Sequence, residues 1–251
     1  MSKSVTIAYP PASPFIASFI RRQGRALTAR RRCLLEEALP RVRVVLPEEA
    51  RAGEEGISLA ALRVGMRERP VWMEIGFGAG EHLAALARRY PETLMLGCEP
   101  HMQGVASLLA AMEQDGLDNI RMHTGDARLL LLHLPDASLT RLIIPFPDPW
   151  PKARHHKRRL IQPETLDLFA AKLAPGAELR FVTDDAAYMA WSLERLLAHP
   201  AFHWMARCRQ DWRTPPADWT PTRYQKKAEK AGRDIFFLRF RRGEGEGFGM
   251  E

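Results

Sequence analysis

The chain has 251 residues, of which 46% are hydrophobic and 27% charged, so it is long enough to bury the core of one domain with small additions. Its 37 Lys and Arg outnumber its 30 Asp and Glu, and this moderate positive excess does not by itself establish a nucleic-acid partner. The three cysteines, Cys33, Cys98 and Cys208, lie far apart, which argues against a disulfide framework or a zinc site.

The first 69 residues are predicted to be a basic N-terminal extension that is partly disordered. Residues 1–17 are rich in proline, and residues 18–40 alternate arginines with apolar positions, which predicts some helix. No apolar run in the chain is long enough to cross a bilayer. We therefore expect a soluble, cytoplasmic protein with no membrane partner and no metal.

From residue 70 to residue 242, short apolar runs alternate with helical patterns. This is typical of an α/β, Rossmann-like fold, in which a mostly parallel sheet has helices on both faces. The predicted strands are 71–75, 93–98, 119–123, 139–145, 177–183 and 234–241. The predicted helices are 81–89, 101–115, 127–133, 163–173 and 185–198. Residues 209–233 are predicted to form a polar loop, and the Gly- and Glu-rich tail 243–251 is predicted to be disordered.

The first predicted strand runs into a glycine-rich segment, EIGFGAGE, at 74–81. Glycines here allow a tight turn and bring backbone N–H groups close to a ligand at the N-terminus of the next helix. The dinucleotide fingerprint would need its third glycine where this chain has Glu81. Because a carboxylate at that position would repel a pyrophosphate, an NAD enzyme is disfavoured. The segment suits a cofactor without phosphates, such as S-adenosylmethionine.

Further carboxylates stand at the ends of successive predicted strands. Glu99 follows the second strand, about twenty residues beyond the glycines, where an acid accepts hydrogen bonds from ribose hydroxyls. Asp126 follows the third strand, where an adenine amine could donate to it, although a helix cap explains this residue about as well. Since ligands of open α/β sheets bind at the carboxyl ends of the strands, the set favours a methyl-donor site.

The fourth predicted strand leads into Pro147-Asp148-Pro149-Trp150, and a dense group of cations follows at 152–159. Asp148 can accept hydrogen bonds from the donor edge of a base, and Trp150 either stacks on a base or stiffens the turn. The cations suit a phosphate backbone, and further cations gather at 21–32 and 239–242. Taken singly, each group of cations is explained by solvation, but three groups beside such a loop predict chemistry on a nucleobase within a polyanion.

The run FPDPWPKARHHKRRL at 146–160 resembles the bacterial tRNA (guanine-N7-)-methyltransferase family. Further matches lie at 18–25, 74–80, 97–101, 125–127, 183–185 and 222–224. The resemblance covers roughly residues 18–242 and implies a class I methyltransferase fold for 70–242. It also implies S-adenosylmethionine as methyl donor and tRNA as partner, with transfer to N7 of the variable-loop guanine at position 46.

The resemblance further implies roles for individual residues. Those implied to bind the donor are Glu74, Gly76, Gly78, Gly80, Glu99, Asp126 and Asp148. Asp148 is also implied to be the essential acid. The implied substrate contacts are Lys152, Asp184, Thr222, Arg223, Tyr224 and Gln225. The implied RNA contacts are Arg154, His155, His156, Lys157, Arg158 and Arg159. The chain departs from the family at Gln225, where a Glu is usual, and at Pro145, where the loop usually has no proline so early.

The chemistry of methylation at guanine N7 explains what an acid at Asp148 could do. Guanine N7 carries an in-plane lone pair and no proton, so its methylation needs alignment and exclusion of water rather than a general base. The ring becomes cationic as N7 is alkylated, and a carboxylate on its N1–H and N2–H edge binds the transition state better than the ground state. We hypothesise that Asp148 does this. The alternatives are a nucleic-acid amino-methyltransferase and a non-catalytic RNA-binding subunit on the same scaffold.

Overall fold

The structure is a computed structural model that describes residues 27–46 and 69–244. The predictions for 1–17, for the start of 18–40 and for nearly all of the tail 243–251 lie outside the described residues. The remainder of 18–40 contains α1 (Ala29–Glu37) and the start of α2 (Leu39–Val42), which confirms the predicted helix there.

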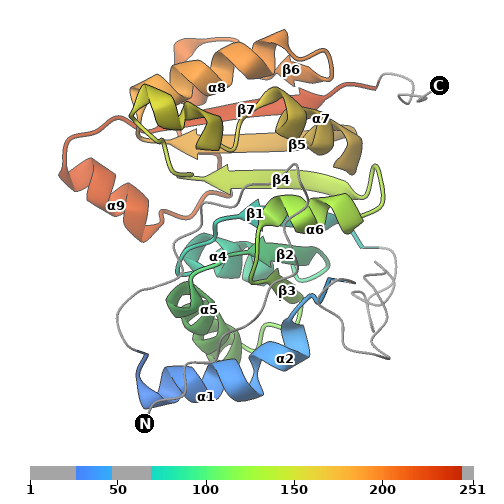
Figure 1. The fold of residues 1–251 in the computed structure, drawn as a ribbon, viewed down its shortest axis with the longest axis vertical. Coiled ribbons are helices and arrows are strands. Elements are labelled where there is room, and N and C mark those ends of the chain that lie inside the picture. The colour runs from blue at the N-terminus through green and yellow to red at the C-terminus, as the bar shows by residue number, and fades with distance from the viewer. Residues whose placement is uncertain (1–26, 47–68, 245–251) are drawn as a thin grey trace.

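Within the described residues, seven strands form one sheet in the order β3-β2-β1-β4-β5-β7-β6. The strands from β1 to β5 pair in parallel, whereas β7 is antiparallel to both β5 and β6. Their bounds are β1 Val71–Ile75, β2 Leu94–Cys98, β3 Ile120–His123, β4 Leu139–Pro145, β5 Leu173–Thr183, β6 Phe202–Trp204 and β7 Phe236–Arg242. The predicted α/β fold with a mostly parallel sheet is confirmed (Figure 1).

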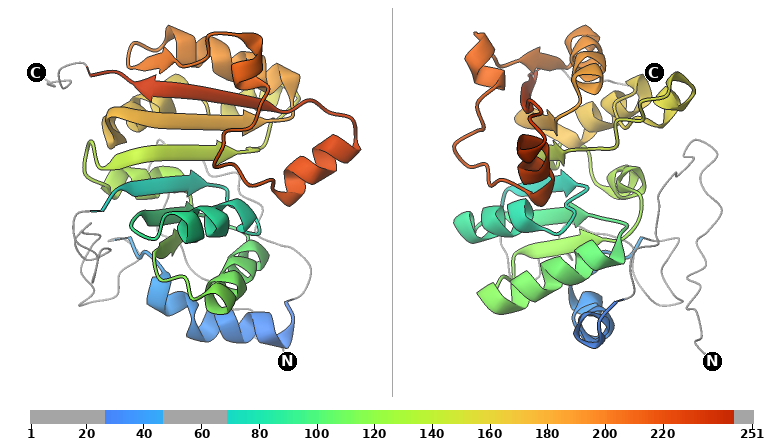
Figure 2. Two further views of the ribbon diagram at one scale, coloured as in Figure 1. Left: turned by 180° about the vertical axis from the view of Figure 1, so that it is seen from behind. Right: turned by 90° about the vertical axis from the view of Figure 1, so that its left-hand side faces the viewer.

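Helices cover both faces of the sheet, and each face buries its own apolar cluster (Figure 2). The helices that flank or follow the strands are α4 Glu81–Arg89, α5 Met102–Asp115, α6 Ala127–His133, α7 Pro163–Lys172, α8 Ala186–Ala198 and α9 Arg223–Lys230. Side chains from α6, α7 and α8 fill one cluster, while those from α1, α4 and α5 fill the other. In β1, Val71 and Met73 face the first cluster and Trp72 packs against the second, because successive side chains of a strand alternate between faces.

The predicted polar loop at 209–233 is wrong. This segment contains a short 3-10 helix, Arg209–Trp212, and the eight-residue helix α9. The buried positions of α9 and its cap are Thr222, Gln225 and Ala228, and two of these three side chains are polar. The sequence of α9 therefore shows no helical spacing of apolar residues, which is the pattern from which helices were predicted. The three-residue strand β6 was also missed, since so short a strand gives no alternating pattern.

Among the described residues, no helix has the length and hydropathy needed to cross a membrane.

Candidate active site

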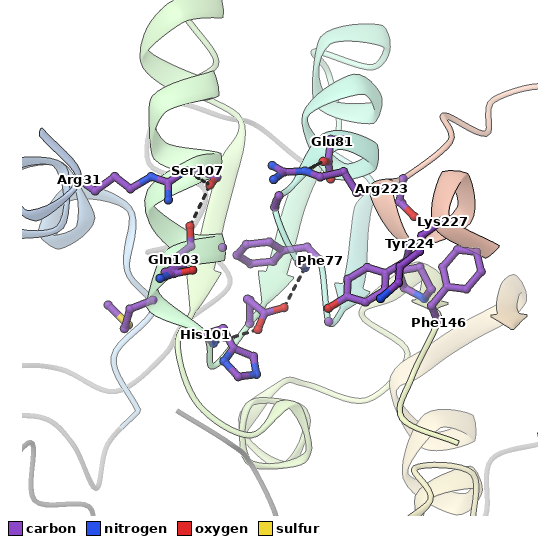
Figure 3. Close-up of a pocket in the computed structure, with 18 of the residues that line it drawn as sticks. Arg31, Phe77, Glu81, His101, Gln103, Ser107, Phe146, Arg223, Tyr224 and Lys227 are labelled. Carbon is purple, nitrogen blue, oxygen red and sulfur yellow. Dashed lines mark hydrogen bonds and ion pairs between the residues drawn. The ribbon is translucent and has the colours of Figure 1, made fainter. Parts of the chain in front are cut away.

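Two cavities lie at the carboxyl ends of the strands, and both touch Gly76. The larger has a volume of about 800 Å³ and is bounded by the glycine-rich segment, the N-terminus of α5, α1 and α9 (Figure 3). We call it the large cavity. The small cavity, about 200 Å³, lies between the ends of β1, β2 and β3 and the loop that follows β4. Some of the residues predicted from the sequence line one of these two cavities, and others line neither.

The glycine-rich segment makes the tight turn that the sequence predicts. Gly76, Gly78 and Gly80 have φ values of 77°, 57° and 84°, a left-handed conformation that glycine adopts without a Cβ penalty. A Cβ added at Gly76 would meet no atom within 4 Å, so this residue borders open space. A Cβ at Gly80 would lie 2.7 Å from Leu108 Cδ1, so this glycine lets α5 approach the turn closely.

Glu99 lies in the wall of the large cavity, where its carboxylate receives two backbone hydrogen bonds. The Gly78 N–H donates to Oε2 at 2.8 Å and the His101 N–H donates to Oε1 at 2.9 Å. Burial raises the pKa of Glu99, and the bonds from His101 and Gly78 oppose that rise. Each oxygen keeps a further lone pair, so the carboxylate can still accept hydrogen bonds from a ligand in the cavity.

Glu74 lies behind the glycine-rich segment and lines neither cavity. Its Oε2 is 2.6 Å from His82 Nδ1, and both side chains are almost completely buried. Glu74 Oε1 and His82 Nε2 have no hydrogen-bond partner among the described residues. The implied contact of Glu74 with a methyl donor stays a prediction, although an acceptor atom is available for it.

Asp126 lines the small cavity and caps α6. Its carboxylate accepts a hydrogen bond from the Arg128 N–H at 3.0 Å and pairs with the Arg128 guanidinium at 2.6 Å. The helix-cap explanation is therefore confirmed. A contact with an adenine amine stays a prediction, and it requires Asp126 to share its oxygens with Arg128.

Asp148 is exposed at the small cavity, in a loop that carries backbone strain on both sides. Phe146 and Trp150 have φ values of 49° and 44°, which non-glycine residues rarely adopt. Two hydrogen bonds hold the loop in place: the Phe146 N–H donates to Val182 O at 2.7 Å, and Arg159 Nε donates to Pro149 O at 2.8 Å. Strain of this kind persists where surrounding contacts over-determine the backbone, and it is typical of functional sites.

Trp150 stiffens this loop. The Arg158 guanidinium lies 5.0 Å from the centre of its ring, and His155 meets it edge-on at 5.8 Å. Partial burial and the neighbouring cations Arg158 and Arg154 lower the pKa of His155. Because Arg158 and His155 already contact the ring of Trp150, this ring is less available for stacking on a base than the sequence suggested.

The six residues from Arg154 to Arg159 do not share one environment. Arg154 and Lys157 are exposed, as is Lys152 just before them. Arg159 is only 4% exposed and lies about 5 Å from the rings of both Tyr188 and Trp191. Arg159 thus holds the loop of Asp148 in place through its hydrogen bond to Pro149. Direct contact with RNA stays a prediction for the exposed neighbours of Arg159.

The residues implied to contact substrate also divide. Thr222, Arg223 and Tyr224 line the large cavity, where Arg223 pairs with Glu81 (Figure 3). Tyr224 is 64% exposed, and a Cβ built on Gly78 would lie 3.6 Å from its ring. Asp184 lines neither cavity and pairs with Arg233 at 2.7 Å. Tyr224 is therefore the aromatic side chain of this group that a base in the large cavity could reach.

An ion-pair cluster that the sequence analysis missed anchors the segment before α9. Asp218 accepts hydrogen bonds from Arg141 Nη1 of β4 at 2.6 Å and from Arg180 Nη1 of β5 at 3.0 Å. Burial would raise the pKa of Asp218, but Arg180 and Arg141 hold it below its usual value. The signal was present in the sequence, because Arg180 stands inside residues 177–183, which the sequence predicts to be a strand. A buried charge in such a strand requires a partner.

Among residues 27–46 and 69–244, no three His, Cys, Asp or Glu side chains come together in a way that could hold a metal ion.

Comparisons with known proteins bear on this site. A family model described as "Putative methyltransferase" matches residues 68–238. A tRNA (guanine-N(7)-)-methyltransferase of Rhodospirillum rubrum is 48% identical over 225 residues, which cover 88% of this chain and 86% of that protein. The chain belongs to this methyltransferase family. A relative of the same description from Caulobacter vibrioides is 44% identical over 223 residues, covering 89% of this chain and 93% of that protein.

Solved structures agree on the fold of this methyltransferase. The 16S rRNA methyltransferase KamB superimposes with a TM-score of 0.53 at 19% sequence identity, covering 75% of this chain and 95% of that one. The antibiotic-resistance methyltransferase Kmr gives a TM-score of 0.50 at 15% identity and covers 76% of this chain and 96% of that one. At these identities the likeness shows the class I methyltransferase fold alone.

Gln225, where this family usually has Glu, is buried behind the wall of the large cavity. Its Oε1 accepts a hydrogen bond from Trp219 Nε1–H at 2.6 Å, and its Nε2 donates to Glu229 Oε1 at 2.8 Å. Trp219 in turn packs between His82 and Phe237. An amide meets both neighbours, because one end accepts and the other donates. Gln225 thus joins α9 to the core of the protein.

We expect Gln225→Glu to lower the free energy of unfolding by about 1–3 kcal/mol, although it restores the family's usual residue. The new carboxylate would lie at a buried position and face Glu229 where an N–H now donates. Urea unfolding at pH 7 measures the effect. The double variant Gln225→Glu with Glu229→Gln provides the control and should recover most of the loss. A single variant as stable as the parent protein would contradict this account of Gln225.

Proposed function

We propose that this protein transfers a methyl group from S-adenosylmethionine to N7 of a guanine in the variable loop of tRNA. Membership of the family supports the reaction class. The observation that carries the proposal is the position of Asp148, which is held in a strained loop beside the glycine-rich segment. An acid fixed at that place can read the edge of a base that enters next to a methyl donor.

The residues around Gly76 fit a donor without phosphates. The glycine-rich segment borders open space at Gly76, and Glu99 offers carboxylate lone pairs toward the large cavity. The acidic Glu81 at the start of α4 stands where a phosphate-binding segment has a third glycine. S-adenosylmethionine, when bound, supplies a methyl group carried by a positively charged sulfur. Glu99, the main chain of 76–80 and Asp126 would hold it.

Asp148 acts on the acceptor. Guanine N7 needs no proton removed, so the protein has to align the base and exclude water. The carboxylate of Asp148 accepts hydrogen bonds from the N1–H and N2–H groups, and its negative charge opposes the positive charge that grows on the ring. Because that charge is larger in the transition state than in the bound substrate, the interaction accelerates the reaction.

Methyl transfer from labelled S-adenosylmethionine to an unmodified tRNA transcript, followed by nucleoside analysis, tests the proposal. N7-methylguanosine is expected, and a transcript with adenine in place of the variable-loop guanine should accept no label. Label on an exocyclic amine would instead identify an amino-methyltransferase. Tight binding of tRNA without transfer of label would identify an RNA-binding subunit.

A further inference from the structure

We propose that the exposed face of α9 is an RNA-binding surface that takes the strand next to the target guanine. This proposal rests on the proposed function, because it assumes that the polymer entering the large cavity is RNA. The predicted polar loop at 209–233 gave this segment no function, and the resemblance implied substrate contacts only at residues 222–225, so neither assigned this surface. The surface consists of Arg223, Tyr224, Lys226, Lys227 and Lys230, all of which are exposed.

The face carries strong positive charge at close spacing. The helix Arg223–Lys230 contains four cations and one carboxylate, Glu229, which accepts a hydrogen bond from Gln225. Lys226 and Lys230 are four residues apart and Lys227 lies between them, so the cations lie side by side on neighbouring turns. Like charges at this spacing destabilise a helix, whereas a row of phosphates would relieve the repulsion.

Contacts at several points hold α9 in place despite this repulsion. Thr222 caps its N-terminus by accepting a hydrogen bond from the Gln225 N–H, and Arg223 pairs with Glu81 of α4. Just beyond its C-terminus, Arg233 pairs with Asp184 at 2.7 Å. The helix is thus fixed to the body of the protein at both ends, and binding of a strand to it needs little further ordering.

The position of the face agrees with a strand entering the large cavity. The helix stands beside the edge of the sheet to which β4 and β5 point (Figure 1). Lys227 and Tyr224 line the large cavity together with Arg31 of α1, so two different elements present cations to the same opening (Figure 3). Exposed aromatic rings beside cations are typical of single-stranded RNA sites, because bases stack on the ring while phosphates meet the cations. Tyr224 supplies that ring.

Lys226 and Lys230 test the surface best, because neither lines a cavity and both are exposed. We expect the double variant Lys226→Gln with Lys230→Gln to weaken tRNA binding about 25-fold at 0.1 M salt, since each phosphate contact to a single strand contributes a slope of about 0.7 in log affinity against log salt. The slope itself should become shallower by about 1.4. Filter binding of an unmodified tRNA transcript across a salt series measures both quantities.

Two further double variants serve as controls. Arg207→Gln with Arg209→Gln removes two exposed cations that line neither cavity and lie outside the cation groups predicted to meet RNA, and it should leave the slope unchanged. Lys226→Arg with Lys230→Arg keeps the charge and should keep the slope. Thermal unfolding of each variant checks that the fold is intact.

The outcomes separate this proposal from the proposed function. A slope unchanged in the Gln variant, or equally reduced in the Arg207/Arg209 control, overturns the surface even if the parent protein makes N7-methylguanosine. A slope reduced in the Gln variant alone supports the surface even if the parent protein makes no N7-methylguanosine, in which case the reaction assigned to the site is the part that fails.

Discussion

Replacement of Asp148 by Asn is expected to slow methyl transfer to tRNA about 100- to 1000-fold while leaving the affinity for tRNA nearly unchanged. The amide has almost the same shape as the carboxylate but lacks the negative charge that opposes the charge developing on the guanine ring. The loss should therefore fall on the chemical step. Single-turnover experiments with saturating tRNA and S-adenosylmethionine measure this step apart from binding and product release.

The matched control is Asp118→Asn, which makes the same change at an exposed position before β3, outside both cavities. It should leave the rate unchanged. An unchanged rate in Asp148→Asn would end the assignment of Asp148 to the transition state. A variant that loses binding of S-adenosylmethionine but keeps its rate at saturation would make Asp148 a donor-binding residue instead.

Replacement of Asp218 by Ala is expected to lower the free energy of unfolding by roughly 3 kcal/mol. Arg180 is 1% exposed, so removal of Asp218 leaves one of its guanidinium nitrogens buried without a carboxylate. Glu178 still pairs with Arg180 at 3.2 Å, which keeps the loss at the low end of the range for broken buried pairs. The variant should also loosen the segment that leads into α9 and so raise the KM for tRNA.

Urea unfolding at pH 7 measures the stability effect, with Asp234→Ala as the control. Asp234 pairs with Arg213 at 2.5 Å but is 67% exposed, so its removal should cost less than about 1 kcal/mol. Equal losses in the two variants would show that the Asp218 cluster is no stronger than a surface ion pair.

The same cluster predicts how stability depends on pH. Burial tends to raise the pKa values of Asp218 and Glu178, but the surrounding arginines, Arg180 above all, hold both below their usual values. Carboxylates with lowered pKa values in the folded state stabilise the protein above about pH 4, and that stabilisation is lost as the pH falls through the folded-state values. The parent protein should lose stability more steeply than Asp218→Ala as the pH is lowered below 4. Parallel curves for the two proteins would contradict the role of Asp218.

Local sequence patterns were sufficient for most of the fold. Strand β1 and helices α4 and α6 begin and end where the pattern places them, because alternating or helical burial and the glycines at 76–80 all act within a few residues. Helix α9 escaped this reasoning because two of the three buried side chains of the helix and its cap, Thr222 and Gln225, are polar, and Trp219, which donates to Gln225, is outside the helix. A polar buried face can be recognised only once its partners are known.

The candidate site was also predicted only in part. The glycine-rich segment, Glu99 and Asp148 lie at the strand ends where parallel-sheet topology puts them. The burial of Arg159 was not predictable, because six consecutive basic or histidine residues give no sign of which one turns inward. That choice depends on Tyr188 and Trp191 of α8, about thirty residues along the chain, which receive its guanidinium.

The left-handed backbone at Phe146 and Trp150 implies a trade-off between thermal stability and catalytic rate. The left-handed conformation lowers the free energy of unfolding by about 1–2 kcal/mol at each of these residues, a cost that a glycine would not incur. A search for heat-resistant variants would therefore favour glycine at both positions, while a search for fast turnover would reject it, because a relaxed loop no longer holds the carboxylate between them at one place. Selection for stability alone would thus replace the two aromatic residues on either side of the acid, and only selection for activity would keep them.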